Sequence, residues 1–268
     1  MTTKSLPSLL DKMWLDYIAI NPLAKKIYDL LSAAGDKLTN DHIALRTFNH
    51  PRVTIDVLAQ PFLASGYQYG GDYHLTEKKL YAKHYQHPDP KLPKIFISEL
   101  KMQDFSSDLQ KTINQLIDQI PAGMEHQFDF ASIGRPWRVS SEQYNNLMKE
   151  SDYAAWLSAF GYRPNHFTVF INELKKFSDI HVLNDFLKEQ GFKLNSSGGE
   201  VKGSKEVCLE QSSTLANNIE VSFEDKKLTI PACYYEFARR YPLPDGKLYQ
   251  GFVAASADKI FESTKDGQ

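Results

Sequence analysis

The chain contains the stretch Asp41-His42-Ile43-Ala44-Leu45-Arg46-Thr47-Phe48, which has the apolar and β-branched character of a short strand. A similar stretch, Asn165-His166-Phe167-Thr168-Val169-Phe170-Ile171, follows later. Both open with a short polar residue and a histidine. After each one, a helical pattern ends at a glycine followed by an aromatic residue, at Gly66 and at Gly191. The two stretches therefore indicate an internal repeat, which would decide the architecture.

Strand-like segments complete each half of this repeat, and in both halves a glutamate lies inside an apolar strand. Glu99 follows His42 by 57 residues, and Glu220 follows His166 by 54 residues. Matching order and spacing predict two βαβββ modules, each opening with a histidine strand and closing with a glutamate strand.

We therefore expect an α+β fold in which the two modules form one curved mixed sheet around a central metal cavity. The modules would cover about residues 38–105 and 162–225. N-terminal, central and C-terminal helical segments would flank them. Residues 1–268 would then form a single globular domain made of two pseudo-repeat halves.

Composition narrows the class of protein. The chain has 268 residues, 42% of them hydrophobic and 24% charged, with a formal net charge of −2. These values are typical of a globular domain, and no basic stripe points to nucleic acid. Charged residues interrupt the N-terminal apolar pattern, and no apolar run approaches the ~20 residues of a membrane span. We expect a cytoplasmic protein, with Cys208 and Cys233 as buried thiols.

The repeat brings four side chains toward the shared concavity: His42, Glu99, His166 and Glu220. Two imidazoles and one carboxylate on one side of a metal suit non-haem iron(II), because other coordination positions stay open. A histidine in a strand is more often a hydrogen-bonded core residue. A glutamate buried in an apolar strand is costly unless a cation, a metal or a proton accompanies it. The repeat alone does not decide which of the two carboxylates completes the site.

Arg46 lies four residues after His42, so alternation along a strand places both side chains on one face. A guanidinium beside a metal is suited to bind a substrate carboxylate through bidentate hydrogen bonds. A salt bridge from Arg46 to Glu99 or Glu220 is the alternative.

Other patterns carry less information. The pair His84-x-x-His87 has a spacing that metals use, but it precedes a proline-rich loop. Tyr234–Tyr241 has the pattern of an amphipathic helix. The chain contains no Gly-x-Ser-x-Gly motif, so it lacks the main signature of a serine hydrolase.

Several of these segments together resemble one family. They are the Asp41–Phe48 stretch, the Asn165-His166-Phe167-Thr168 stretch, Ile219-Glu220-Val221 and the C-terminal segment 251–263. The combination is similar to the 2-oxoadipate dioxygenase/decarboxylase (2-hydroxyglutarate synthase) family, whose fold is related to the vicinal oxygen chelate proteins.

The resemblance implies a role for each matching position. His42, His166 and Glu220 fall where the family holds iron, and Arg46 falls where it binds the substrate carboxylate. Glu99 would then support the site without touching the metal, or act as a base.

Ala255 and Ser256 match the part of the C-terminal segment that touches substrate, although the family has a bulkier aliphatic residue in place of Ala255. The expected cofactor is Fe(II), with Zn, Ni, Co or Mn able to occupy the same site. The expected partners are a small 2-oxo acid and O2, with no nucleic acid and no membrane, and the oligomeric state stays open.

The implied reaction converts 2-oxoadipate to 2-hydroxyglutarate and CO2. Two alternatives are an oxygen-independent lyase or isomerase that uses a divalent metal on the same scaffold, and a non-catalytic binding protein.

Overall fold

The computed structural model describes residues 5–264 as an α+β fold. Its helices are α1 (Leu6–Ile20), α2 (Pro22–Ala33), α3 (Ile55–Leu63), α4 (Ser107–Asp118), α5 (Ser141–Glu150), α6 (Asp152–Phe160), α7 (Ile180–Glu189), α8 (Ala254–Ile260) and the C-terminal 3-10 turn η5 (Phe261–Thr264). Its strands are β1 (Asn40–Phe48), β2 (Gln68–Leu75), β3 (Leu80–Gln86), β4 (Lys94–Leu100), β5 (His166–Phe170), β6 (Lys202–Ser204), β7 (Leu209–Ser213), β8 (Asn218–Ser222), β9 (Lys227–Pro231) and β10 (Glu236–Arg240).

Eight of these strands form one curled mixed sheet in the order β2-β3-β4-β1-β5-β10-β7-β6. The first four come from the first half of the chain and the last four from the second half. The central pair, β1 and β5, is antiparallel and joins the halves, whereas each half contains one parallel pair, β1 with β4 and β5 with β10. Two modules of equal strand order thus meet at one seam, which confirms the expected fold class.

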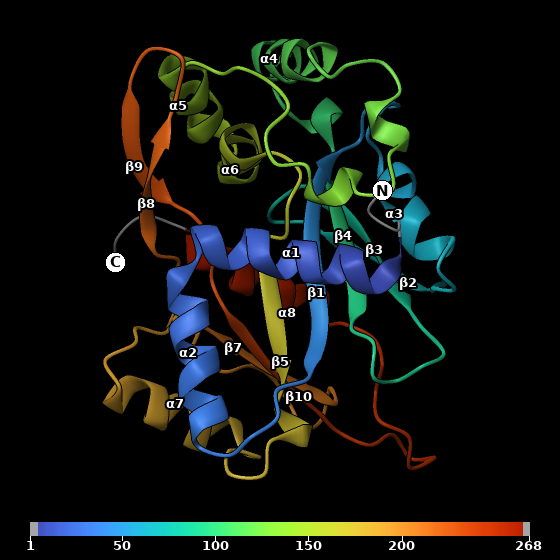
Figure 1. Cartoon of the computed structure of the whole chain (residues 1–268), viewed down its shortest axis with the longest axis vertical. Helices are drawn as coiled ribbons and strands as arrows, with labels where there is room; N and C mark the ends of the chain where they lie inside the picture. The colour runs from blue at the N-terminus through green and yellow to red at the C-terminus, as the bar shows by residue number, and fades with distance from the viewer. Residues whose placement is uncertain (1–4, 265–268) are drawn as a thin grey trace.

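Helices cover both faces of this sheet (Figure 1). Helix α1 crosses in front of β1 and β5, where Trp14 packs edge-on against Phe167 at a ring distance of 5.1 Å. Helix α8 lies behind the strands and contacts β2, β6 and β7. Because side chains alternate along a strand, Phe167 faces α1 while its neighbour His166 faces the opposite, concave side. The concave side therefore receives the two histidine side chains.

Local sequence explains the helix boundaries. The helical pattern over residues 141–159 forms two helices, because Ser151 ends α5 and its hydroxyl accepts a hydrogen bond from the Ala154 amide at the start of α6. Every residue of α6 after Asp152 is buried. Its residues Tyr153 and Trp156 extend to the side chain of Arg46 on β1.

Two expectations about the second half were wrong. Tyr234–Tyr241 is no amphipathic helix, because Glu236–Arg240 forms the strand β10 between β5 and β7. The second half also does not close near residue 225. Strands β8 and β9 form a separate two-stranded hairpin, and the strand that closes the half is β10.

No helix in the described part of the chain is long and apolar enough to cross a membrane. The cytoplasmic location stays a prediction. Both cysteines carry free thiols, and Cys233 is fully buried whereas Cys208 is only partly so.

Candidate metal centre

Three side chains on three adjacent strands converge on the concave face of the sheet: His42 on β1, His166 on β5 and Glu236 on β10. The Nε2 atoms of the two histidines lie 3.3 Å apart. Glu236 Oε1 lies 3.5 Å from His42 Nε2, and Glu236 Oε2 lies 3.1 Å from His166 Nε2. Ligand atoms that share one metal at bonds of about 2.1 Å are separated by roughly 3–3.5 Å. The group therefore has the spacing of a metal-binding triad.

Sheet register produces this convergence. Thr168 on β5 pairs with His42 on one side and with Glu236 on the other, so the three residues form one row across the sheet. His166 lies two positions before Thr168 on the same face. The row and this offset place one imidazole beside the other and the carboxylate across from both.

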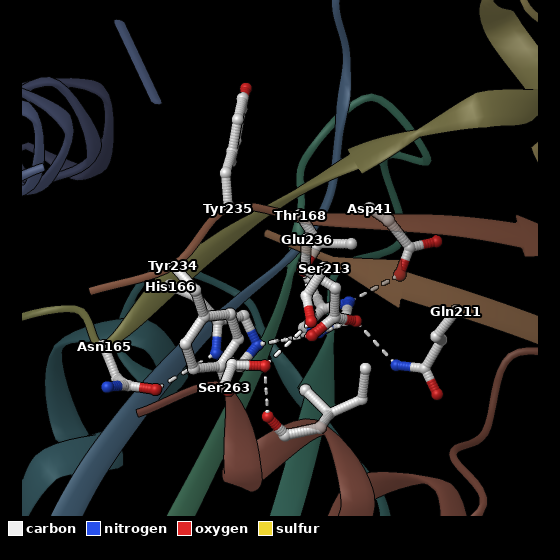
Figure 2. A network of polar contacts seen from close by, with 12 residues as sticks. Asp41, Asn165, His166, Thr168, Gln211, Ser213, Tyr234, Tyr235, Glu236 and Ser263 are labelled. Carbon is white, nitrogen blue, oxygen red and sulfur yellow. Dashed lines mark hydrogen bonds and ion pairs between the residues drawn. The ribbon is translucent and has the colours of Figure 1, made fainter. Parts of the chain in front are cut away.

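Nε2 of each histidine faces the triad, and Nδ1 of each histidine contacts a side-chain oxygen of the preceding residue. Asp41 Oδ1 lies 2.8 Å from Nδ1 of His42, and Asn165 Oδ1 lies 3.3 Å from Nδ1 of His166. The contact between Asn165 and His166 is visible in Figure 2. An oxygen at Nδ1 favours the tautomer that carries its proton there, which leaves the Nε2 lone pair free for a metal.

Burial shifts the pKa values of two members of the triad, His166 and Glu236. Desolvation, assisted by the neighbouring His42 and Arg46, holds the pKa of His166 well below its ordinary value, so its imidazole is neutral. Desolvation also raises the pKa of Glu236, although His42 partly opposes this. Gln211 Nε2 donates to Glu236 Oε1 at 2.6 Å, whereas Oε2 is buried without a hydrogen-bond partner in the described residues. An orphaned carboxylate oxygen beside the neutral imidazole of His166 fits a divalent cation.

Apolar side chains enclose the triad. Phe96 on β4 and Phe252, Ala257, Ile260 and Phe261 of the C-terminal segment line the same small cavity as the triad and Gln211. The Phe252 ring stands edge-on to the His42 ring at 4.8 Å. Such walls exclude water and strengthen electrostatic interactions inside the site.

Arg46 lies close to the triad and is 2% exposed. Its Nη2 donates to Asn165 Oδ1 at 3.1 Å, the oxygen that also contacts His166. The rings of Tyr153, Trp156 and Phe261 surround the guanidinium at 4.8–4.9 Å. Its Nε has no hydrogen-bond partner among residues 5–264. The alternative, a salt bridge from Arg46 to Glu99 or Glu220, is not formed, because Glu99 accepts from the Ile55 amide and Glu220 pairs with Lys227.

The expectation that Glu220 completes the triad is corrected by the structure. Glu220 lies on β8 in the separate hairpin, where its side chain is 61% exposed and forms an ion pair with Lys227 at 2.7 Å. The carboxylate beside the histidines belongs to Glu236. The count of residues from His166 led to β8 because the hairpin is inserted before the strand that closes the second half.

Glu99 also lies outside the triad. Its Oε2 accepts a hydrogen bond from the Ile55 amide at the start of α3. Register explains the mismatch between the halves: Ala44 pairs with Phe96, whereas Thr168 pairs with Glu236. Phe96, not Glu99, is thus the counterpart of Glu236 in the first half.

The C-terminal positions differ in detail from the expectation. Ala255 is exposed and Ser256 is buried, but neither lines the cavity of the triad. Their neighbours Ala257 and Ile260 on α8 do.

Glu236 was missed because Tyr234–Tyr241 has a helix-like apolar spacing. A strand buried on both faces shows no simple alternation, and β10 also carries charged side chains. The one available signal was an acidic residue inside a predominantly apolar segment, the same signal that nominated Glu99 and Glu220.

Comparison with known proteins decides the family. A sequence profile of the family described as 2-oxoadipate dioxygenase/decarboxylase matches residues 20–125 and 125–248. The chain belongs to the 2-oxoadipate dioxygenase/decarboxylase family. The resemblance noted in the sequence is thereby confirmed.

Relatives in this enzyme family include two plant proteins. The chloroplastic 2-oxoadipate dioxygenase/decarboxylase of Arabidopsis thaliana is 36% identical over 96% of this chain and 76% of its own length. A rice protein of the same description, chloroplastic or amyloplastic, is 35% identical over 94% of this chain and 76% of its own length.

Solved structures agree with the fold. The hydroxyglutarate synthase of Oryza sativa in complex with 2-oxoadipate superposes with a TM-score of 0.91 at 34% identity, over 97% of this chain and 91% of that one. A Shewanella frigidimarina protein described as a candidate hydrolase superposes with a TM-score of 0.90 at 52% identity, over 95% and 100%. A glyoxalase-superfamily protein of Ralstonia eutropha, 19% identical with a TM-score of 0.77 over 91% and 84%, shares the fold.

Proposed function

We propose that this chain is an iron(II)-dependent dioxygenase that converts 2-oxoadipate and O2 to 2-hydroxyglutarate and CO2. The observation that carries the proposal is the buried triad of His42, His166 and Glu236 beside the unpaired guanidinium of Arg46. Two histidines and one carboxylate are the ligand set of many non-haem iron oxygenases, because they leave neighbouring coordination positions open. The relatives named for this reaction support the choice of substrate.

The site residues fit such a metal. His42 and His166 present Nε2, and Glu236 presents the oxygen that has no other partner. Bound at these three atoms, iron(II) would supply the Lewis acidity and the oxygen chemistry of the reaction.

The chain's own side chains would bind and orient the substrate. Arg46 is suited to hold a carboxylate of the 2-oxo acid, since it is a buried cation with an unused donor. Gln211 fixes the Glu236 carboxylate by donating to Oε1. Phe96, Phe252 and Phe261 would keep water away from the reacting carbons.

The two other functions have less support. Glu99 was the candidate base of an oxygen-independent lyase or isomerase, but its carboxylate is engaged at the start of α3. A binding protein without chemistry would have no use for a buried carboxylate oxygen without a partner.

The test is iron(II) reconstitution without oxygen, followed by addition of 2-oxoadipate and O2. We expect one CO2 and one 2-hydroxyglutarate for each O2 consumed, and none from metal-free protein. Turnover with Zn or Ni under strict anaerobiosis would instead indicate the lyase or isomerase. Absence of O2 uptake in protein that has bound iron would refute the proposal.

A further inference from the structure

Each half of the molecule places a short polar residue directly before its histidine, and both make the same contact. Asp41 Oδ1 meets Nδ1 of His42, and Asn165 Oδ1 meets Nδ1 of His166. Figure 2 shows Asn165 beside His166 at one end of the network and Asp41 at the other. Both residues therefore orient an imidazole in the same way. They differ in charge, because one is a carboxylate and the other a neutral amide.

Each of these two residues also binds one buried arginine. Asp41 receives two hydrogen bonds from Arg240, from Nε to Oδ2 at 2.6 Å and from Nη2 to Oδ1 at 2.9 Å. Arg240 Nη1 donates to the carbonyl oxygens of Tyr249 and Gly251. Burial would raise the pKa of Asp41, but the Arg240 guanidinium holds it well below its ordinary value. This arginine is thus neutralised, and all three of its nitrogens are used.

The second arginine, Arg46, is not neutralised by a carboxylate in the part of the chain that the structure describes. Arg46 donates to Asn165 Oδ1, which carries no charge, and its Nε donates to nothing in the described residues. Arginine ion pairs within residues 5–264 involve Arg52, Arg163, Arg239 and Arg240, and Arg46 takes part in none. Three aromatic rings also surround its guanidinium and add cation–π attraction.

An unpaired, buried guanidinium is energetically expensive, and the fold retains one here although a carboxylate would fit. An aspartate is nearly isosteric with asparagine, and the first half shows that it satisfies both the imidazole and an arginine. The neutral amide therefore keeps two functions apart: it orients His166 and leaves the charge of Arg46 available.

We propose that Asn165 is a specificity-determining positioning residue, whose neutral side chain reserves the positive charge of Arg46 for the carboxylate of an incoming 2-oxo acid. The inference rests on the proposed function for the identity of that anion. The corresponding pair in the first half, Asp41 with Arg240, has a structural role. Arg240 binds the backbone carbonyls of Tyr249 and Gly251, and this stretch leads into the segment that encloses the site.

The decisive variant is Asn165→Asp. Binding of 2-oxoadipate to iron(II)-loaded protein is measured without oxygen by isothermal titration calorimetry. We expect Kd to rise at least about tenfold, because the new carboxylate neutralises Arg46 and repels the substrate. The iron(II) affinity is expected to be retained or increased, since an anionic oxygen at Nδ1 makes His166 a stronger ligand. In steady state the loss should appear in KM more than in kcat. Unchanged substrate affinity would overturn the inference.

Two further measurements separate a charge effect from a structural one. In an Arg46→Gln background, Asn165→Asp should weaken substrate binding much less than it does in the wild type, because the cation that it neutralises is gone and only direct repulsion by the new carboxylate is left. A full additional tenfold loss in that background would contradict the proposal.

The second measurement needs no substrate and no metal. Asn165→Asp should raise the Tm of the metal-free protein, since it gives Arg46 a counter-charge, whereas the matched variant Asp41→Asn should lower it by leaving Arg240 without one. A lowered Tm for Asn165→Asp would overturn the claim that Arg46 is unneutralised. If the wild-type protein binds iron but no 2-oxo acid, the proposed function fails, while this Tm comparison still decides the charge argument.

Discussion

Glu220 and Glu236 show how far the environment of one residue type can vary within a chain. The first is exposed beside Lys227, and the second is 1% exposed among two histidines and Gln211. An exposed ion pair contributes little to stability or binding. Among residues 5–264 only one oxygen of the buried carboxylate has a hydrogen-bond partner, and a metal would satisfy the other.

Replacing each glutamate by glutamine tests this assignment. Glu236→Gln should lower iron(II) affinity by about tenfold to a hundredfold, because the variant has no anionic ligand. Glu220→Gln serves as the control and should bind iron like the wild type. Metal affinity would be measured by competition with a chelating dye. Loss of iron from the Glu220 variant, with retention in the Glu236 variant, would contradict the assignment.

Glu236→Gln should increase the stability of the metal-free protein, although it weakens metal binding. Burial raises the pKa of Glu236, so the folded state binds a proton more readily than the unfolded state. This term stabilises the fold below the unfolded pKa and is lost as the pH rises through the folded pKa. Glu236→Gln removes the cost of a buried charge and should raise Tm more at pH 8 than at pH 5. Thermal melts of metal-free protein at both pH values check the difference, and an equal shift at both would contradict it.

The sequence predicted two of the three triad residues and the arginine beside them. His42 and His166 lie near the start of the apolar strands that open each repeat, and alternation along β1 assigns Arg46 to the face of His42. Glu236 could not be predicted, because its place in the site depends on which strand pairs with β5. Strand pairing is a long-range property, and the spacing of residues along the chain does not determine it.

At the level of elements, the β8–β9 hairpin accounts for the error. It lies between β7 and β10 in the chain and belongs to no part of the main sheet. The chain therefore reaches β10 later than the first half reaches β4. Most other elements were predictable from apolar periodicity and helix-ending glycines. Ser151 separates α5 from α6, and its side chain is a typical N-cap.

Strand β10 also offers a matched comparison between two consecutive arginines. Arg240 pairs with Asp41 at 1% exposure of both side chains, whereas Arg239 pairs with Asp179 near the surface. We expect Arg240→Met to lower the free energy of unfolding by about 3–5 kcal/mol, because it leaves a buried carboxylate without its cation. Arg239→Met should cost no more than about 1 kcal/mol.

Urea unfolding of both variants in the metal-free state measures the two losses. Similar losses for the two arginines would show that the buried pair adds nothing beyond a surface pair.

On the scale of the whole molecule, the triad draws its ligands from both halves. His42 belongs to the first module, and His166 and Glu236 belong to the second. A metal ion would therefore connect the modules across the β1–β5 seam and bind only the folded chain. Excess metal at about 100 times Kd should stabilise the protein by roughly 2.7 kcal/mol.

This stabilisation would be seen as a rise in Tm when zinc or iron(II) is added, by roughly 5–10 °C for a protein of this size. His166→Ala should remove the rise while the protein still melts cooperatively. A rise that persists in this variant would indicate binding elsewhere.

The antiparallel seam has a consequence for the positions of the two histidines. His42 and His166 sit on rungs of one main-chain ladder, with His42 opposite Thr168 and Ala44 opposite His166. Backbone hydrogen bonds between β1 and β5 thus set the separation of the two histidines. A shift of one strand by a single residue would turn its histidine toward α1. The pairing of β1 with β5 therefore fixes the backbone positions from which the two imidazoles extend. Part of the apolar cover of the site, in contrast, comes from α8 and η5, which do not belong to this ladder.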